Sequence, residues 1–179
     1  MTTAVHERAR RIRFVTCDVD GVLTDGRIYV DDTGREFKAF SALDGVGLNL
    51  LARAGVTVAW ITGSAAPAVA QRARQLRIAH VIQDTGDKLS AWIKLRAQLG
   101  FDAAESAHIG DDLPDLPILS ACGLAATVPH APAQVRAQSH YVTTREGGSG
   151  AVREFAELIL TAKGVLAEMS LQAVSARNP

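Results

Sequence analysis

Short apolar runs alternate with amphipathic stretches along most of the chain. Repeated strand–helix units of this kind are typical of a mostly parallel sheet with helices on both faces. The pattern therefore predicts an α/β fold, a Rossmann-like three-layer sandwich, in a single domain over residues 1–179. The predicted strands are residues 12–17, 56–61, 80–83, 107–110, 124–128 and 140–143, and the predicted helices are residues 44–54, 65–76, 87–99, 114–121, 131–138 and 151–163.

Two segments depart from this alternation. Residues 27–40 contain two extended runs around the turn sequence DDTG, which is typical of a β-hairpin. We expect this hairpin to protrude over the first connection between strands. The C-terminal residues, from about 165 to 179, show no strong periodicity, and we expect them to be loosely held.

Charge and composition exclude several classes of protein. Lys and Arg together number 19, as do Asp and Glu, so bulk charge does not favour binding to nucleic acid or to a membrane surface. No apolar run approaches the roughly 20 residues of a membrane span, and the run after the basic N-terminus is too short for a signal peptide. Cys17 and Cys122 form no disulfide framework or zinc spacing, which favours a reducing compartment, the cytoplasm.

Polar side chains follow three of the predicted strands, and a lysine opens a predicted helix. Because ligands bind at the carboxyl ends of the strands in open α/β sheets, these side chains are expected to converge at one edge. Clustered carboxylates repel each other unless a hard cation lies between them, and Mg²⁺ takes carboxylates together with phosphate oxygens. The pattern therefore predicts a Mg²⁺ site that also binds a phosphoryl group. The side chains are those of Asp18 and Asp20, Thr62 with Gly63 and Ser64, Lys88, and Asp111 with Asp112.

The chemistry of a phosphomonoester gives each residue an expected role. The negative charge of the ester repels a carboxylate nucleophile. Lys88, the Thr62 hydroxyl and the backbone N–H groups near Val19 to Gly21 are expected to neutralise it together with Mg²⁺. Asp18 could then attack phosphorus and form an aspartyl-phosphate. Asp20 would protonate the leaving oxygen and later deprotonate the attacking water.

The metal ligands expected from the same pattern are Asp18, Asp20 and Asp111. Asp112 is expected to orient either Lys88 or a water on the metal. A calcium loop starting at Asp18 is excluded, because Val22 and Leu23 occupy positions where such a loop needs a polar ligand and a glycine.

These motifs resemble those of a known superfamily. The sequences DVDGVLTD (18–25), ITG (61–63) and GDDLPD (110–115), with Lys88 between the last two, are similar to the four motifs of haloacid-dehalogenase-type phosphatases, in the same order. FSALDG (40–45), QRA (71–73) and GGSGAVRE (147–154) resemble 3-deoxy-D-manno-octulosonate 8-phosphate phosphatases. The resemblance covers nearly the whole chain. It implies Mg²⁺-dependent hydrolysis of a phosphorylated eight-carbon sugar acid in lipopolysaccharide synthesis.

The resemblance also implies substrate contacts, and here the chain departs from the family. The implied contacts beyond the residues above are Ser41, Asp44, Gly45 and Arg72. The family usually has arginine where this chain has Ser64, Asn49 and Ser149. The sugar-acid carboxylate is then left to Arg72, to the backbone of residues 41–45, or to a basic side chain of a neighbouring subunit. A nine-carbon sialic-acid-type 9-phosphate or another sugar phosphate remains the alternative substrate.

Assembly follows from the spacing of the motifs. Many phosphatases of the superfamily carry a cap domain after the first or second motif. Here Asp18 and Thr62 are 44 positions apart, and Thr62 and Lys88 are 26 apart, so the hairpin, two helices and one strand leave no room for a cap. An uncapped site needs shielding from bulk water. The resemblance implies a homotetramer in which a neighbour's hairpin or tail covers each site.

Other interpretations stay open for some of these features. An isolated DxD after a strand is more often a capped acidic turn, and GGSG (147–150) could lead flexibly into the last helix or cover the substrate. A signalling receiver domain also uses aspartates, a threonine and a lysine, but takes its acidic pair and its phosphorylated aspartate from different strands. A non-catalytic oligomerisation module, as found beside sialic-acid activating enzymes, would have no use for the clustered acids.

Overall fold

A six-stranded sheet forms the centre of the protein, and every neighbouring pair of its strands is parallel. The computed structural model describes residues 3–175, except for the side chains of 173–175. The strand order is β5-β4-β1-β6-β7-β8. The predicted α/β sandwich is confirmed. The strands are β1 (Phe14–Cys17), β4 (Thr57–Ile61), β5 (His80–Ile82), β6 (Ser106–Ile109), β7 (Leu124–Thr127) and β8 (Tyr141–Val142).

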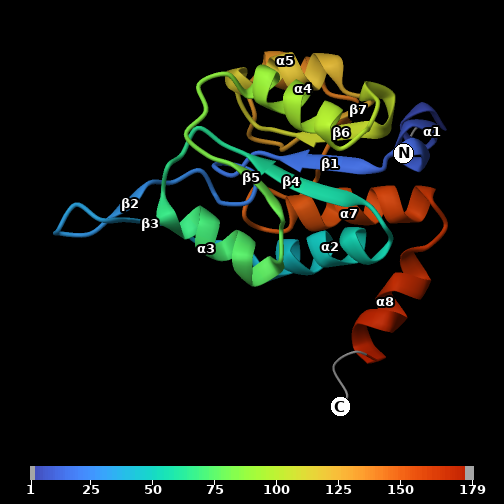
Figure 1. Ribbon diagram of the computed structural model, residues 1–179, viewed down its shortest axis with the longest axis horizontal. Coiled ribbons are helices and arrows are strands. Elements are labelled where there is room, and N and C mark those ends of the chain that lie inside the picture. The colour runs from blue at the N-terminus through green and yellow to red at the C-terminus, as the bar shows by residue number, and fades with distance from the viewer. Residues whose placement is uncertain (1–2, 176–179) are drawn as a thin grey trace.

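Helices cover both faces of this sheet (Figure 1). One face carries α1 (Thr3–Arg11), α2 (Ala42–Arg53), α3 (Pro67–Leu76) and α7 (Ala151–Ala162). The other carries α4 (Lys88–Gln98), α5 (Leu116–Ala121) and α6 (Ala133–Gln138). Short 3₁₀ turns at Ala103–Glu105 and Leu113–Asp115 precede β6 and α5.

The core has two halves, one on each face of the sheet. Side chains alternate along each strand, so Val15 and Trp60 pack with α2 and α7, whereas Phe14 and Ile61 pack with α4 and α5. Because both faces are covered, most residues of β1, β4, β6 and β7 are buried, and the majority of them are apolar. Thr16, His108 and Thr127 are buried polar residues among them. Trp60 and Trp92 are buried, as expected of core residues.

Two helices at the ends of the chain were not predicted from the pattern. Helix α1 buries only Val5 and Ala9, so its apolar stripe is narrow. The tail expected to be loose from residue 165 instead forms α8 (Leu166–Ser175), in which Met169 is buried against the main core. Packing against the rest of the protein stabilises a helix whose own sequence signal is weak. Residues 176–179 lie outside the described residues.

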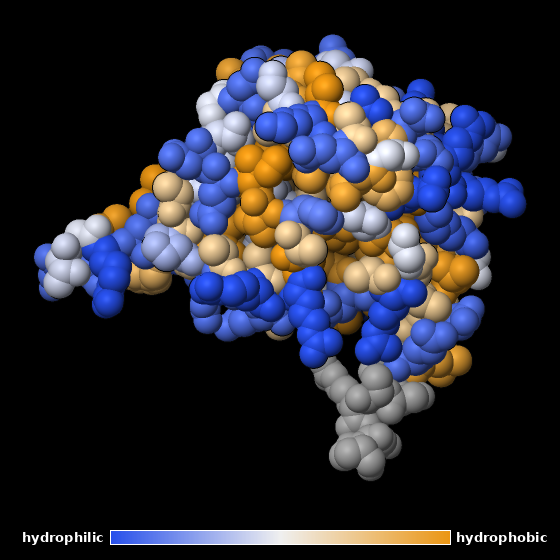
Figure 2. Space-filling model, in the orientation of Figure 1, coloured by the Kyte–Doolittle hydropathy of each residue, from blue (hydrophilic) through white to orange (hydrophobic). Residues whose placement is uncertain are grey.

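The predicted hairpin is confirmed and consists of β2 (Tyr29–Val30) and β3 (Glu36–Phe37), which pair in antiparallel fashion. The rings of Tyr29 and Phe37 stack across it with centroids 5.4 Å apart. The hairpin projects from the body of the protein (Figure 1), and Figure 2 shows a hydrophilic tip with hydrophobic residues nearer the body. Ile28, Val30 and Phe37 are exposed.

No helix among the described residues has the length and hydropathy required to cross a membrane.

Candidate active site

The register of the sheet brings the predicted site residues to one edge. Cys17, the last residue of β1, lies opposite Trp60 of β4 and Ile109 of β6. The residues that follow these strands therefore leave the sheet side by side. They meet a cavity of about 520 Å³ that also receives Lys88, the first residue of α4. Its lining includes Asp18, Asp20, Thr62, Gly63, Ser64 and Lys88, with Ile28, Glu36 and Lys38 from the hairpin segment.

Asp18 is buried beside one cation and two other carboxylates. Its Oδ1 lies 2.8 Å from Lys88 Nζ, and only 4 % of the residue is exposed. Burial and the charge of Asp115 raise the pKa of Asp18 to about 7, although Lys88 opposes the shift. The same two causes raise the pKa of Asp111 to about 6. In the metal-free protein these two acids therefore resist being ionised together.

The acidic cluster fits a hard divalent cation. Oxygens of Asp18, Asp111 and Asp115 lie within 4.8 Å of one another. Gly21 makes room for this arrangement, because a Cβ atom there would lie 2.0 Å from Asp111 Oδ2. An all-oxygen donor set is the kind that Mg²⁺ prefers. The predicted ligands Asp18 and Asp111 are thus brought together, and both would hold the ion.

Asp20, the third predicted ligand, has its carboxylate elsewhere. Its Oδ1 lies 2.5 Å from Lys38 Nζ, and Lys38 also lies 2.7 Å from Glu36 Oε1. The side chain of Asp20 is therefore an ion-pair partner of the hairpin segment and not a member of the acidic cluster. The sequence pattern did not identify Lys38 as a site residue, because it lies in the predicted hairpin and belongs to no motif.

Asp115, to which the sequence assigned no role, has all its contacts inside the site. Its Oδ1 accepts from Lys88 Nζ at 2.7 Å and lies 3.2 Å from His108 Nε2. Its Oδ2 accepts from the N–H groups of Asp111 and Asp112, at 3.2 and 3.4 Å. Burial disfavours its charge, but His108 and Lys88 outweigh this and lower the pKa of Asp115 to about 2. Its position as the last residue of the GDDLPD motif was the feature of the sequence that could have identified Asp115 as a site residue.

The first of the two roles expected for Asp112 is wrong. Lys88 is oriented by Asp18 and Asp115, while Asp112 Oδ1 accepts from the N–H of Leu113 at 2.8 Å and caps the following turn. Asp112 is exposed, whereas Lys88 is buried between Asp18 and Asp115. The positions of Asp111 and Asp112 in the sequence do not show which of the two lies in the acidic cluster. The conformation of the turn determines that Asp111 does and that Asp112 is exposed.

The Thr62 hydroxyl is free to donate a hydrogen bond to a bound group. The residue is buried, and its Oγ1 accepts from the N–H of Ser64 at 3.0 Å. A hydroxyl that already accepts from the backbone keeps its own proton for another partner. Ser64 Oγ is used locally, since it accepts from the N–H of Ala66 at 3.2 Å.

The four substrate contacts implied only by the resemblance do not line this cavity. Asp44 is buried and accepts from the N–H groups of Gly150 and Arg153 at the start of α7. Its carboxylate therefore caps this helix, and its contact with a substrate stays a prediction. Gly45 faces Arg72 of α3, because a Cβ atom there would lie 2.9 Å from Arg72 Nη2. Ser41 precedes α2 as its N-cap residue.

The GGSG segment packs on the loop that follows β1. A Cβ atom on Gly147 would lie 1.8 Å from Gly21 O, and the N–H of Gly148 donates to Val22 O at 3.0 Å. Gly150 then leads directly into α7. The segment therefore supports the loop that carries Asp18 and Asp20.

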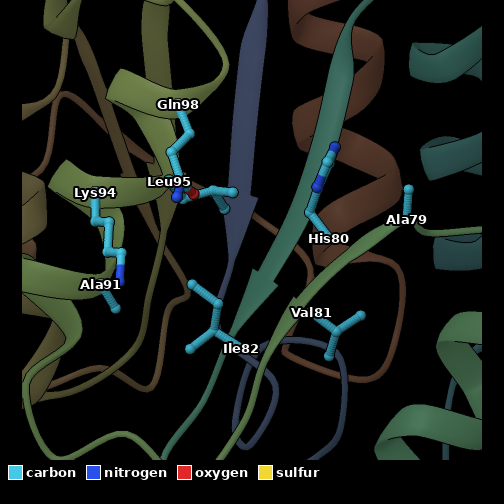
Figure 3. Close-up of a pocket in the computed structure, with 8 residues that line it drawn as sticks. All are labelled: Ala79, His80, Val81, Ile82, Ala91, Lys94, Leu95 and Gln98. Atoms are coloured by element: carbon cyan, nitrogen blue, oxygen red, sulfur yellow. The ribbon is translucent and has the colours of Figure 1, made fainter.

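A second hollow, of about 470 Å³, lies at the edge of the sheet between β5 and α4 (Figure 3). Figure 3 shows Ile82 from the strand and Leu95 from the helix on opposite sides of it. No carboxylate is among its lining residues, so it lacks the groups that a metal and phosphoryl site needs.

Comparison with known proteins agrees with this geometry. The haloacid dehalogenase-like hydrolase family matches residues 64–155. The 3-deoxy-D-manno-octulosonate 8-phosphate phosphatase of Yersinia pestis is 44% identical over 162 residues, which cover 90% of this chain and 87% of that protein. The enzyme of the same name from Escherichia coli strain K12 is 40% identical over 167 residues, covering 93% and 89%.

Solved structures give the same result. The Moraxella catarrhalis phosphatase of this name, in complex with magnesium, phosphate and KDO, superposes with a TM-score of 0.94 at 41% identity, covering 97% of this chain and 99% of that one. The cobalt-bound Haemophilus influenzae phosphatase gives 0.87 at 37% identity, covering 92% and 99%. With the motif residues gathered at one sheet edge and identities of this size over nearly its full length, the chain belongs to the 3-deoxy-D-manno-octulosonate 8-phosphate phosphatase family of haloacid dehalogenase-like hydrolases.

Proposed function

We propose that this protein is a Mg²⁺-dependent phosphatase that converts 3-deoxy-D-manno-octulosonate 8-phosphate to the free sugar acid and phosphate. The observation that carries the proposal is the buried Asp18, which lines the cavity, is held by Lys88 and lies next to Asp111. The Moraxella catarrhalis relative, solved with magnesium, phosphate and the sugar acid, supports both the ion and the substrate.

The residues divide the reaction between them. When bound, Mg²⁺ would offset the charge of the phosphoryl group and of the acids around it. Asp18 attacks phosphorus and forms an aspartyl-phosphate, while Lys88 and the Thr62 hydroxyl hold the phosphoryl oxygens. Asp20 gives a proton to the leaving sugar oxygen and then takes one from the water that hydrolyses the intermediate. Lys38 occupies one oxygen of Asp20 and leaves the other for this proton.

The carboxylate of the sugar acid has fewer partners here than the family pattern provides. Ser64 stands where an arginine is usual, and its hydroxyl, which accepts from the N–H of Ala66, has at most one proton to donate and carries no charge. Lys38, on the hairpin side of the cavity, is paired with Asp20 and Glu36. The remaining candidates are Arg72, the backbone of residues 41–45 and a basic side chain from a neighbour. A nine-carbon 9-phosphate therefore stays the alternative substrate.

We also propose that the protein works as a cytoplasmic homotetramer. The cavity is open on its hairpin side, and Ile28 lines it with 76 % of its surface exposed. A neighbour's hairpin or tail that packed there would shield the phosphoryl intermediate from bulk water. Two buried, unpaired cysteines support a reducing location.

Turnover of a panel of sugar phosphates in the presence of Mg²⁺ tests the function. The eight-carbon 8-phosphate is expected to give the highest kcat/KM. A preference of about tenfold or more, or about 1.4 kcal/mol, for a nine-carbon 9-phosphate or a hexose 6-phosphate would make the substrate assignment wrong. Absence of turnover with every phosphate would favour a non-catalytic oligomerisation module.

A further inference from the structure

A chain of buried polar side chains runs from the site into the sheet. Lys88 Nζ contacts Asp115 Oδ1, His108 Nε2 lies 3.2 Å from the same oxygen, and Thr16 Oγ1 lies 2.8 Å from His108 Nδ1. Thr16 in β1 and His108 in β6 are register partners, and neither is exposed to solvent.

A threonine and a histidine inside a covered parallel sheet need a reason to be there. Buried polar groups cost free energy unless they are hydrogen-bonded, and an apolar pair would fill the same space without that requirement. If the two residues satisfied only each other, they would be a local feature of the sheet. His108 instead directs its second ring nitrogen at Asp115, so the pair ends at the carboxylate that holds Lys88.

Asp115 is restrained on every side. Two backbone N–H groups bind its Oδ2, and a Cβ atom on Gly110 would lie 2.4 Å from its Cγ. On the Oδ1 side the restraints are Lys88 and His108. Lys88 has a flexible stem, so His108 is the rigid partner that determines where this oxygen lies.

We propose that His108 is a positioning residue that, held by Thr16, fixes Asp115 and through it places Lys88 against Asp18. In this proposal the ring takes the tautomer that donates from Nε2 to Asp115 Oδ1. The Thr16 hydroxyl, which also lies 3.1 Å from Ala107 O, sets the ring plane through its contact at Nδ1. His108 lies behind Asp115 and acts on the reacting groups only through it. The proposal rests on the proposed function in one respect, namely that Lys88 acts on a phosphoryl group.

Three single substitutions test the role through turnover. His108→Met removes the donor at similar volume and is expected to lower kcat about tenfold or more. His108→Gln keeps an N–H near the Nε2 position and should recover at least about a third of the parent kcat. Ser106→Ala is the matched control, because it removes a buried hydroxyl of the same strand that binds Asp102 O at 2.7 Å and has no link to Asp115. It should lower stability while kcat stays within about twofold of the parent value.

Two outcomes of these measurements would overturn the proposal. One is a kcat for His108→Met within about twofold of the parent value. The other is a Gln variant no more active than the Met variant, since that indicates a packing role alone. If His108→Met does not fold, Thr16→Val replaces it. Its kcat should fall about threefold, and an unchanged kcat would contradict the proposal.

A spectroscopic measurement separates this inference from the function itself. In the ¹⁵N-labelled protein, the Lys88 ammonium group should give a signal protected from exchange, because two buried carboxylates hold it; its absence in Lys88→Met assigns it. The signal should broaden or disappear in His108→Met and persist in Ser106→Ala. If the parent protein is inactive on every phosphate, the proposed function is refuted. The Lys88 signals of the parent protein and the variants still test the positioning role of His108 in that case. An unaltered Lys88 signal in His108→Met would refute the positioning role.

Discussion

At the scale of single residues, the charge on Asp18 depends on what occupies the site. Lys88 favours its ionised form, whereas burial, Asp115 and Asp111 oppose it. Asp115 stays ionised because His108, Lys88 and two backbone N–H groups stabilise its carboxylate. The site therefore holds one strongly ionised acid and two that a cation would help to ionise.

Metal-free protein is expected to lose stability as pH rises from about 4 to about 7. In the folded state the pKa of Asp18 is raised from 3.8 to about 7. Between these values the folded protein binds more protons than the unfolded chain, so the free energy of unfolding falls, by at most about 1.4 kcal/mol per pH unit for this group. Asp111 contributes in the same direction up to about pH 6. Urea unfolding with a chelator present measures this, and a rise in stability across the window would contradict it. Saturating Mg²⁺ should weaken the trend.

Replacing Asp18 with asparagine should abolish turnover and leave the fold intact. An amide is no nucleophile, and the loss of a repelling charge should raise the melting temperature of the metal-free protein near pH 7. Asp20→Asn is the comparison, since it should be impaired most with poor leaving groups, which need a proton. Undiminished turnover by Asp18→Asn would refute the covalent mechanism.

Asp111→Ala should weaken Mg²⁺ binding by about tenfold more than Asp112→Ala. Asp111 belongs to the acidic cluster, whereas Asp112 is exposed and caps a turn. Isothermal titration calorimetry with Mg²⁺ alone measures both. Equal losses would show that Asp112 is also a ligand.

At the scale of elements, helix α7 depends on a residue from a distant part of the sequence. The carboxylate of Asp44, in α2, accepts from the N–H of Gly150, which precedes α7, and from that of Arg153 in its first turn. A carboxylate there satisfies donors that the helix cannot satisfy itself and suits the positive end of its dipole. This contact fixes the glycine segment that supports the loop of Asp18.

Asp44→Ala is expected to lower the free energy of unfolding by about 1–2 kcal/mol, the usual cost of a lost cap. Asp44→Asn keeps a side-chain acceptor and should lose less. Chemical denaturation measures both, and KM for the sugar phosphate should stay within about twofold in Asp44→Asn. A large rise in KM without loss of stability would support the substrate contact implied by the family resemblance.

At the scale of the whole molecule, the hairpin exposes apolar side chains that no other part of the same chain covers among the described residues. Its two short strands carry Val30 and Phe37, both more than half exposed, and its base lines the cavity. Burial of such side chains is a strong driving force for association.

Light scattering is expected to give about four times the 19.0 kDa mass of one chain. The double substitution Ile28→Ser with Phe37→Ser should lower this mass by removing apolar area from the interface. Ile93→Ser, on the exposed side of α4, is the matched control and should leave the mass unchanged. A mass of one chain for the unmodified protein would contradict the tetramer.

The sequence by itself determined the fold class, the hairpin and the identity of most groups at the site. Apolar runs with a fixed alternation of strands and helices permit few arrangements other than a covered parallel sheet. Because the ends of parallel strands share one edge, Asp18, Thr62 and Asp111 could be placed together without coordinates. The helices α1 and α8 were not predicted, because α1 buries only Val5 and Ala9 and the sequence of α8 has no strong periodicity. Packing against the rest of the protein stabilises both.

Only the tertiary structure decided which carboxylate binds which cation or backbone N–H group. Spacing could not show that the turn after β6 points Asp115 at Lys88 and Asp112 toward solvent, or that Asp20 pairs with Lys38 of the hairpin. It also could not show that Asp44 caps a helix more than 100 residues away in sequence, or that His108 stands behind Asp115. Some of these contacts join segments far apart in the chain, as Asp44 and Arg153 do. The local ones, such as that of Asp112 with Leu113, depend on turns and side-chain directions that the hydrophobic pattern does not encode.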